Sequence, residues 1–158
     1  MHAAEHAGHA TLIDEIRRLS NVDVRKCYQC GRCTAGCPMA GFMDITPTQI
    51  MRSVQRAETP EDRDALLRCN AIWDCASCIT CSTRCPKEVD VARVIDALRE
   101  TAKKEDKVSE EQKNILAFHK AFLASIKSTG RIPEFMLIMR YKMSTLSLFQ
   151  DALLAPKM

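Results

Sequence analysis

The fold of this chain is decided by the segment Cys27-Tyr28-Gln29-Cys30-Gly31-Arg32-Cys33-Thr34-Ala35-Gly36-Cys37-Pro38. A second copy begins 48 positions later and reads Cys75-Ala76-Ser77-Cys78-Ile79-Thr80-Cys81-Ser82-Thr83-Arg84-Cys85-Pro86. Both copies have the pattern C-x2-C-x2-C-x3-C-P, an internal repeat around which the rest of the sequence can be placed. The two Cys runs hold eight of the nine Cys residues in a chain of 158 residues, so cysteine chemistry dominates the sequence.

The spacing within each run is that of an iron–sulfur ligand set. A 4Fe-4S cluster presents four irons at tetrahedral corners, and each iron takes one thiolate. Three Cys at i, i+3 and i+6 can wrap three corners, and in ferredoxins with two clusters the fourth Cys ligates the other cluster. We therefore expect two 4Fe-4S clusters. The expected ligands are Cys27, Cys30, Cys33 and Cys85 for cluster 1, and Cys75, Cys78, Cys81 and Cys37 for cluster 2.

Other uses of clustered Cys fit the pattern less well. Structural zinc sites use paired C-x2-C knuckles with a longer gap inside each site. A redox pair of the thioredoxin type needs only one C-x-x-C. A disulfide scaffold is disfavoured because the Cys count is odd and the segment Met1–His6 has neither the basic nor the apolar region of an export signal. We expect a cytoplasmic protein, in which thiols stay reduced.

Composition and charge further limit the classes of protein to which this chain can belong. Hydrophobic residues make up 46% and charged residues 27% of the chain, as in globular proteins. The net charge of +3 gives little reason to expect nucleic-acid binding. Two oxidised clusters with eight thiolates would lower that charge to about −1. The most apolar short run, Phe135-Met136-Leu137-Ile138-Met139, is far too short to span a bilayer.

Helix signals occupy the segments around the Cys runs, and no alternating strand pattern is found. Each expected helix begins at a residue that suits a helix N-terminus. The starts are Thr11, Thr46-Pro47, Thr59-Pro60, Asp90, the capping box Ser109-Glu110-Glu111-Gln112, and Pro133. We expect these helices to end at Asn21, near residues 57 and 69, near Gly130 and near Met143. For the helix that begins at Asp90, the sequence indicates no clear end. The sequence therefore predicts an all-α protein in which the Cys runs form loops and turns between helices.

Three regions are expected along the chain. Residues 1–21 form an N-terminal helix and flexible end, 22–104 a helical dicluster ferredoxin domain, and 105–158 a C-terminal helical extension. The charged segment 103–107 is expected to be a hinge or linker. The extension carries an apolar stripe, comprising Ile115, Leu116, Phe122, Leu123 and Ile126, with Phe135, Leu137 and Ile138 beyond. Part of this stripe is expected to dock on another subunit; the alternative is that it folds back on the chain's own helices.

The long spacing between the runs resembles that of a helical dicluster ferredoxin module. Between Cys37 and Cys75 lie 37 residues with two Pro-started helices. Such modules occur in the iron–sulfur subunit of succinate dehydrogenase and in the C-type subunit of heterodisulfide reductase. This chain lacks the extra 2Fe-2S domain and the broken Cys run of the former, so it resembles the latter. The resemblance rests on the segments 26–33, 73–78 and 85–91, with Gly130-Arg131, Arg140-Tyr141-Lys142 and Ala155-Pro156-Lys157-Met158 in the tail.

That resemblance implies an electron-relay role. In the family, the C-type subunit passes electrons between an A-type subunit, which carries flavin and clusters, and a B-type subunit. The B-type subunit performs the disulfide chemistry with a duplicated Cys-Cys-Gly motif. This chain has no Cys-Cys pair and no G-x-G-x-x-G fingerprint, so no catalytic residue and no flavin or nicotinamide site is expected on it. The alternatives are a free ferredoxin-type carrier and a relay subunit of a membrane quinone-linked reductase.

A few residues outside the ligand set have plainer interpretations. Cys69 lies six positions before Cys75, and we expect it to be a buried apolar residue. Trp73, Ile72 and Ile79 flank the second run and are expected to give apolar cover over a cluster. The spaced residues His2, His6 and His9 are expected to belong to a frayed end.

Overall fold

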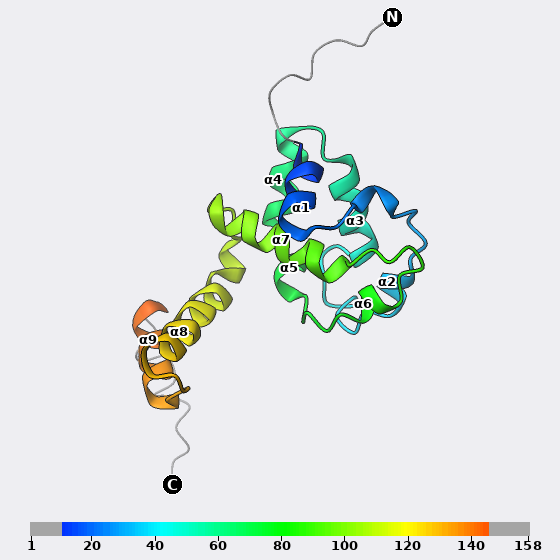
Figure 1. The fold of residues 1–158 in the computed structure, drawn as a ribbon. Helices are drawn as coiled ribbons and strands as arrows, with labels where there is room; N and C mark the ends of the chain where they lie inside the picture. The colour runs from blue at the N-terminus through cyan, green and yellow to red at the C-terminus, as the bar shows by residue number, and fades with distance from the viewer. Residues whose placement is uncertain (1–10, 146–158) are drawn as a thin grey trace, which may run out of the picture. The chain divides into compact units, whose positions relative to one another are not determined.

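The computed structural model describes residues 11–145, and they form two compact units. The first unit ends at Ser109 and the second begins at Glu110. All regular structure in the described residues is helical, so the all-α prediction is confirmed (Figure 1). No helix within 11–145 is both long and apolar enough to cross a membrane. The expectations for His2, His6 and His9, and for the tail segment 155–158, fall outside the described residues.

The first unit alternates longer helices with single helical turns. Its longer helices are α1 (Leu12–Ser20), α3 (Pro47–Arg56), α4 (Pro60–Arg68) and α7 (Val91–Lys104). Its short elements are the 3-10 turn η1 (Val24–Lys26) and the one-turn helices α2 (Arg32–Ala35), α5 (Ala71–Asp74) and α6 (Thr80–Thr83). Both α2 and α6 lie inside the Cys runs, which the sequence predicts as loops and turns.

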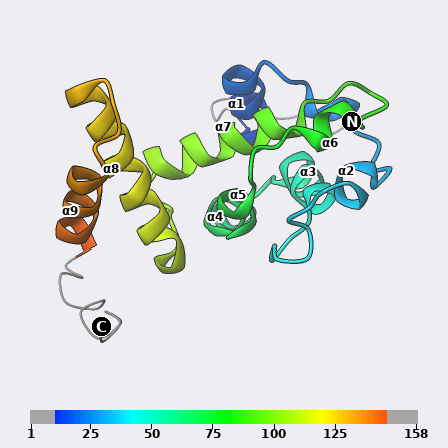
Figure 2. The same ribbon diagram turned by 90° about the horizontal axis from the view of Figure 1, so that it is seen from below.

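Helix α7 forms the centre of the first unit. It contacts α1, α4, α5 and α6, with α1 on one side and α4 and α5 on the other (Figure 2). The helix buries Val94, Ile95 and Leu98 at i, i+1 and i+4 spacing, in keeping with its predicted apolar face. Ile16 of α1 and Leu67 of α4 are also fully buried. Each such side chain contributes roughly 1.5–3 kcal/mol on burial, so this core holds the Cys runs in place.

The predicted helix starts are confirmed where the signal is local. Asp62 and Thr59 form a reciprocal capping box at α4, with a bond of 3.1 Å from the Asp62 N–H to the Thr59 hydroxyl. The Asp90 carboxylate accepts a hydrogen bond of 3.2 Å from the Arg93 N–H at the start of α7. These contacts satisfy N–H groups that have no partner inside the helix.

The predicted capping box at Ser109 is wrong. The Ser109 hydroxyl instead donates to the Asn70 side-chain oxygen at 2.7 Å, 39 positions earlier in the chain. A 3-10 turn, η2 (Glu110–Gln112), precedes helix α8 (Lys113–Thr129), which begins without a side-chain cap. The competing partner is a residue distant in sequence, which a local pattern cannot reveal.

The segment after α7 stays attached to α4. Lys107 Nζ lies 3.1 Å from an Asp64 carboxylate oxygen and 2.9 Å from one of Glu105. Arg63 of α4 pairs with Glu105 and, at 2.8 Å, with Glu15 of α1. This network ties α1, α4 and the end of α7 together, and the first compact unit continues as far as Ser109.

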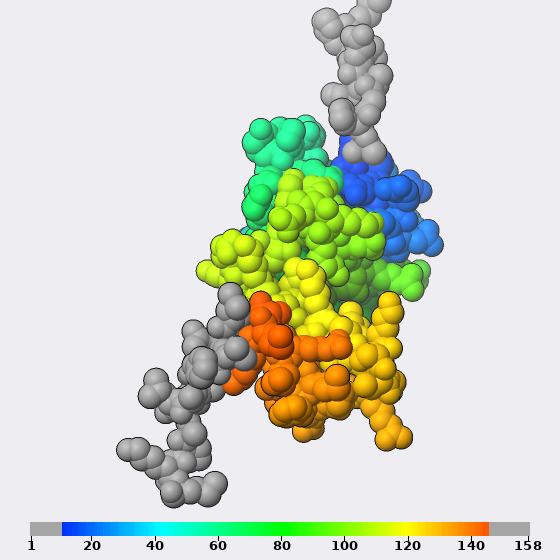
Figure 3. Space-filling view, turned by 90° about the vertical axis from the view of Figure 1, so that its left-hand side faces the viewer, coloured from blue at the N-terminus to red at the C-terminus, as the bar shows by residue number. Residues whose placement is uncertain are grey.

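The second unit is a pair of packed helices, α8 and α9 (Glu134–Thr145), shown side by side in Figure 3. Helix α8 ends at Gly130, as predicted, because the left-handed backbone (φ 65°) lets the Gly130 N–H reach the Ile126 carbonyl at 2.8 Å. The Phe118 ring packs edge-on against Tyr141 with centroids 5.9 Å apart. Ala121 and Ser125 are the buried residues of α8, whereas Leu123 is 64% exposed.

Candidate metal centres

The eight Cys residues of the two runs surround two cavities. The Cys75 cavity is lined by Cys75, Cys78, Cys81 and Cys37, and it encloses about 350 Å³, counted out to the open solvent. The Cys27 cavity is lined by Cys27, Cys30, Cys33 and Cys85, and it encloses about 310 Å³ on the same measure. The two groups of four thiols are those that the sequence predicts as the two ligand sets.

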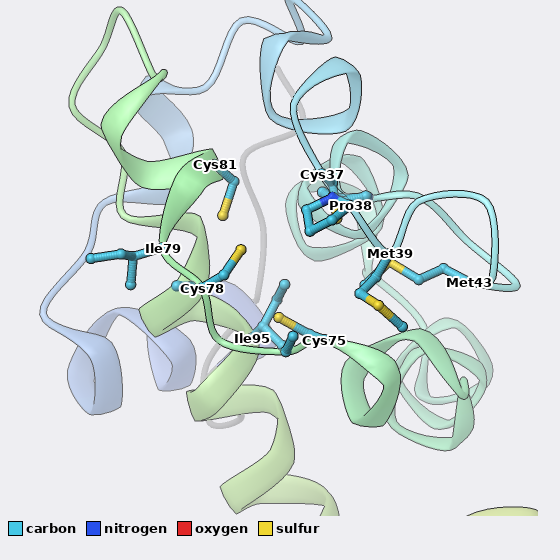
Figure 4. A pocket seen from close by; sticks show the side chains of 12 residues that line it. Cys37, Pro38, Met39, Met43, Cys75, Cys78, Ile79, Cys81 and Ile95 are labelled. Carbon is cyan, nitrogen blue, oxygen red and sulfur yellow. The ribbon is translucent and has the colours of Figure 1, made fainter.

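The fourth Cys of each run crosses to the other run's cavity. In Figure 4 the thiols of Cys75, Cys78 and Cys81 lie on one side of the Cys75 cavity, and Cys37 and Pro38 lie across from them. Cys85 makes the reciprocal crossing to the Cys27 cavity. Helices α2 and α6, which precede the two crossing residues, are in contact. The two runs are therefore interlocked.

The two runs share one backbone conformation. Positive φ angles occur at Gln29 (63°) and Gly31 (79°), and at the equivalent positions Ser77 (51°) and Ile79 (54°). Each run then forms the single helical turn that carries its third Cys. Gly31 adopts a left-handed backbone without strain, whereas a β-branched residue such as Ile79 does so at a cost of about 1–2 kcal/mol. Gly31 is the one local signal for these turns.

A hydroxyl group ties each run to the helix that follows it. The Thr34 hydroxyl accepts a 3.0 Å hydrogen bond from the N–H of Thr48 in α3. The equivalent Ser82 hydroxyl accepts a 3.3 Å bond from the N–H of Ala92 in α7. These N–H groups lie in first turns, where the helix has no internal partner for them. The internal repeat therefore extends beyond the Cys runs to include α3 and α7.

Each of these helices also anchors the entry to its run with one long polar side chain. Gln55 of α3 donates to the carbonyl oxygens of Val24 (2.9 Å) and Cys27 (2.8 Å). Arg99 of α7 donates to the equivalent carbonyl oxygens, those of Ile72 and Cys75. Neither anchor is expected from the sequence, because each lies more than 20 residues from the carbonyl groups it binds.

The two runs meet where their crossing residues turn. Gly36 and Arg84 occupy equivalent positions, one residue before Cys37 and Cys85. A Cβ atom at Gly36 would lie 2.6 Å from Cδ of Arg84, so the missing side chain makes room for the arginine. The side chain at this position is thus absent in one run and long in the other, which allows the two turns to pack closely.

Asp44 fixes the segment that leads into the second run. Its carboxylate accepts hydrogen bonds of 2.8 Å from the N–H groups of Asn70 and Ala71, at the start of α5. Helix α5 ends at Asp74, directly before Cys75. Asp44 itself follows Met43, which lines the Cys75 cavity. This capping contact spans 26 and 27 positions, too far for a local sequence pattern to reveal it.

The thiols differ in their electrostatic surroundings, and the second Cys of each run shares one environment. Cys30 and Cys78 are exposed. The pKa of Cys30 is lowered, most by the N–H of Arg32, and that of Cys78 is lowered, most by the Thr80 hydroxyl. Burial raises the pKa of Cys27 and Cys81. Each run therefore offers a more exposed, more easily ionised thiol beside less exposed ones, and thiolates are the ligand form of Cys.

The apolar cover of the Cys75 cavity comes partly from residues that lie outside the Cys runs. Met39, Met43 and Ile95 line it together with Ile79. Ile79 was expected to provide such cover, and its side chain extends away from the thiols in Figure 4. Trp73 and Ile72 are buried but do not line either cavity, so the cover role expected of them stays a prediction.

Cys69 belongs to neither group of thiols. It ends α4 and lines neither cavity. Burial, helped by the nearby Asp44 carboxylate, raises the pKa of its thiol to about 11. Cys69 is therefore a protonated, part-buried side chain at neutral pH, in keeping with the apolar role expected for it.

The donor set fits a cluster at each cavity. Four thiols around one cavity is what a 4Fe-4S cluster requires, and several sulfur atoms have hydrogen-bond partners. Cys33 Sγ lies 3.2 Å from the Thr48 hydroxyl, and Cys85 Sγ accepts a 3.3 Å bond from the Val89 N–H. Hydrogen bonds to ligand sulfur are among the features that set a cluster's reduction potential.

Comparison with known proteins identifies the region that contains all eight Cys of the two runs. The sequence matches the 4Fe-4S dicluster domain family over residues 26–89. Relatives include the C-type subunit of the ferredoxin:CoB-CoM heterodisulfide reductase of Methanosarcina acetivorans, 36% identical over 87 residues that cover 55% of this chain and 33% of the relative. The C-type iron-sulfur subunit of the CoB--CoM heterodisulfide reductase of Methanopyrus kandleri is 30% identical over 97 residues, covering 61% and 48%.

A third relative is named for a different reaction. The C2 subunit of the H(2)/formate:CoB-CoM heterodisulfide,ferredoxin reductase of Methanococcus maripaludis is 33% identical over 79 residues, covering 50% of this chain and 40% of the relative. The chain therefore spans less than half of the length of these three relatives. Their names confirm the resemblance to the C-type subunit of heterodisulfide reductase that the Cys runs and their flanking segments predict.

Proposed function

We propose that the chain is an electron-relay subunit of a heterodisulfide-reductase-like complex, because its residues 26–89 match the 4Fe-4S dicluster domain family. Its cofactors are two 4Fe-4S clusters. Each cluster, when bound, accepts and releases one electron at a time. The observation that carries the proposal is the division of eight thiols into two groups of four around neighbouring elements of one unit.

We assign the ligands by cavity. Cluster 1 takes Cys27, Cys30, Cys33 and Cys85, and cluster 2 takes Cys75, Cys78, Cys81 and Cys37. The assignment is supported by the cavity linings and by the shared backbone conformation of the two runs. Crossing of Cys37 and Cys85 keeps the two clusters in one rigid unit, and a relay needs such a fixed separation between its centres.

We further propose that the partners are an A-type flavin and iron–sulfur subunit and a B-type subunit with the Cys-Cys-Gly motif, in the cytoplasm. The sequence of this chain has no Cys-Cys pair, so the disulfide chemistry belongs elsewhere. The second unit offers a surface for docking. It exposes large apolar side chains on both helices, among them Leu123 on α8 and Phe135 on α9. Exposed apolar patches of this kind are typical of interaction sites.

Anaerobic purification of the full chain from its native host tests this proposal. We expect about eight irons and eight acid-labile sulfides per chain, a count that follows from two 4Fe-4S clusters. We also expect co-purification with a flavin-bearing protein and with a second protein that has Cys-Cys-Gly motifs. Iron near four per chain in a fully loaded sample would contradict the two clusters. A monomer without partners would favour a free carrier, and recovery in a membrane fraction would favour a quinone-linked complex.

A further inference from the structure

The two cavities have equivalent anchors that differ in charge. Gln55 and Arg99 hold equivalent carbonyl groups at the entry to their runs. The correspondence extends to a third contact. Gln29 donates to Gln55 at 2.8 Å, and Arg99 donates to the hydroxyl of Ser77, the residue equivalent to Gln29, at 3.0 Å. The anchor is therefore neutral at the Cys27 cavity and cationic at the Cys75 cavity.

The charge on Arg99 is poorly exposed to solvent. Its side chain is 17% exposed, and a guanidinium group does not deprotonate in proteins. Its ion-pair partner is Asp96, 3.0 Å away, whose side chain is 58% exposed. Solvent and salt screen an exposed carboxylate more than a part-buried guanidinium. The guanidinium is therefore the less screened member of the pair, and it binds the carbonyl of the ligand Cys75.

We propose that Arg99 is a positioning residue that also raises the reduction potential of the cluster held in the Cys75 cavity. Reduction adds one electron to that cluster, supplied by the external reductant. A fixed positive charge in surroundings of low dielectric constant stabilises the added negative charge. A guanidinium group carries a permanent charge, so it gives up no proton in this step. Gln55 positions the Cys27 cavity in the same way but adds no charge. This inference rests on the ligand assignment proposed above.

A redox titration of the full chain, followed by electron paramagnetic resonance, tests the charge. Arg99→Gln copies the anchor of the other repeat, and Arg99→Lys keeps the charge but loses the planar fork. Arg93→Gln, an exposed arginine on the same helix with a 66% exposed side chain, is the matched control. Variants Cys37→Ser and Cys85→Ser assign each signal to its cavity. We expect Arg99→Gln to shift the midpoint of the Cys75-cavity cluster to lower potential, with the other cluster unchanged.

The outcomes distinguish an electrostatic effect of Arg99 on the reduction potential from a purely structural role. Arg99→Lys should keep a midpoint closer to that of the unmodified chain, and Arg93→Gln should leave both midpoints in place. Equal shifts in Arg99→Gln and Arg99→Lys, or no shift in either, would overturn the electrostatic role while leaving two clusters in place. If Arg99→Gln loses the cluster, Asp96→Asn tests the electrostatic role instead. Removing this carboxylate should raise the midpoint potential of the Cys75-cavity cluster and leave that of the other cluster unchanged. An unmodified chain with a single cluster would instead refute the proposed function.

Discussion

Single residues in this protein take their properties from their surroundings more than from their type. All nine Cys side chains have the same chemistry, yet Cys30 and Cys78 are exposed with lowered pKa values, and Cys69 is part-buried with a pKa raised to about 11. Hydrogen bonds from the chain favour the thiolate in the first two, and burial favours the thiol in the third. These differences separate the two exposed thiols, Cys30 and Cys78, from the thiol of Cys69.

The raised pKa of Cys69 predicts slow alkylation of the folded holoprotein. The thiolate is the reactive form, so the rate at pH 8 should be low and should rise about tenfold per pH unit up to about 11. Mass spectrometry after iodoacetamide treatment measures this. The same chain unfolded at pH 8, where thiols have a pKa of about 8.5, is the control and should react rapidly. Fast labelling of Cys69 in the folded protein at pH 8 would contradict the burial.

The same shift predicts a pH dependence of stability. Between about pH 8.5 and about 11 the unfolded chain loses the Cys69 proton while the folded chain keeps it, so folded stability falls as pH rises. After allowance for solvent screening the loss is roughly 2 kcal/mol. Cys69→Ala should lose less stability over this range and should retain its full iron content. Loss of iron in that variant would place Cys69 near a cluster.

At the scale of elements, the first unit contains two copies of a Cys run followed by a helix. Helices α3 and α7 each bind the preceding run at its entry, through Gln55 and Arg99, and at its turn, through Thr48 and Ala92. The two copies then exchange their fourth Cys. Because α3 and α7 pack in one hydrophobic core, the two Cys runs cannot move apart without breaking these contacts.

This exchange predicts reciprocal effects of two substitutions. Cys37→Ser should damage the cluster of Cys75, Cys78 and Cys81, and Cys85→Ser should damage that of Cys27, Cys30 and Cys33. A serine oxygen is a poorer ligand for iron than a thiolate, so each change should lower the occupancy or alter the spectrum of one cluster. Resonance spectra and iron analysis of the two variants measure this. Cys69→Ser is the matched control, and damage to a Cys residue's own run would refute the assignment.

At the scale of the whole molecule, the two units have different surfaces. The first unit has its own core around α7. The second exposes much of its apolar surface, and Phe135 of α9 is 75% exposed. None of the described residues of α9 is buried. The stripe predicted from the sequence is thus mainly at the surface of α8 and α9, with Leu116, Phe122 and Leu137 half-buried.

Truncation after Ser109 should therefore separate cluster binding from assembly. The first unit contains all eight proposed ligands and the helices that anchor them, so iron content should be retained. Binding to the partner subunits should be lost, as measured by co-purification. In the full chain, Leu123→Ser and Phe135→Ser together should weaken the same binding, whereas Lys120→Ser, an exposed control on α8, should not. Normal assembly of the truncated chain would refute a docking role for the second unit.

Local features of this protein could be read from the sequence. The spacing of the Cys runs predicted two clusters and their eight thiols, and the grouping of the ligands stays a prediction until the variants are made. The helix ends at Thr59, Asp90 and Gly130 were predicted because each depends on contacts within four residues. Spacing along the chain fixes such contacts whatever the rest of the molecule does.

Only the tertiary structure decided which residues anchor the Cys runs and which residues line their cavities. Asp44 reaches the start of α5, Ser109 binds Asn70 rather than its own helix, and Arg99 binds the entry to the second run. Met39, Met43 and Ile95 line the Cys75 cavity, although none of them belongs to a Cys run. Each of these pairings depends on where the chain returns after tens of residues. That path is set by the packing of helices around α7, and no local pattern of residues specifies it.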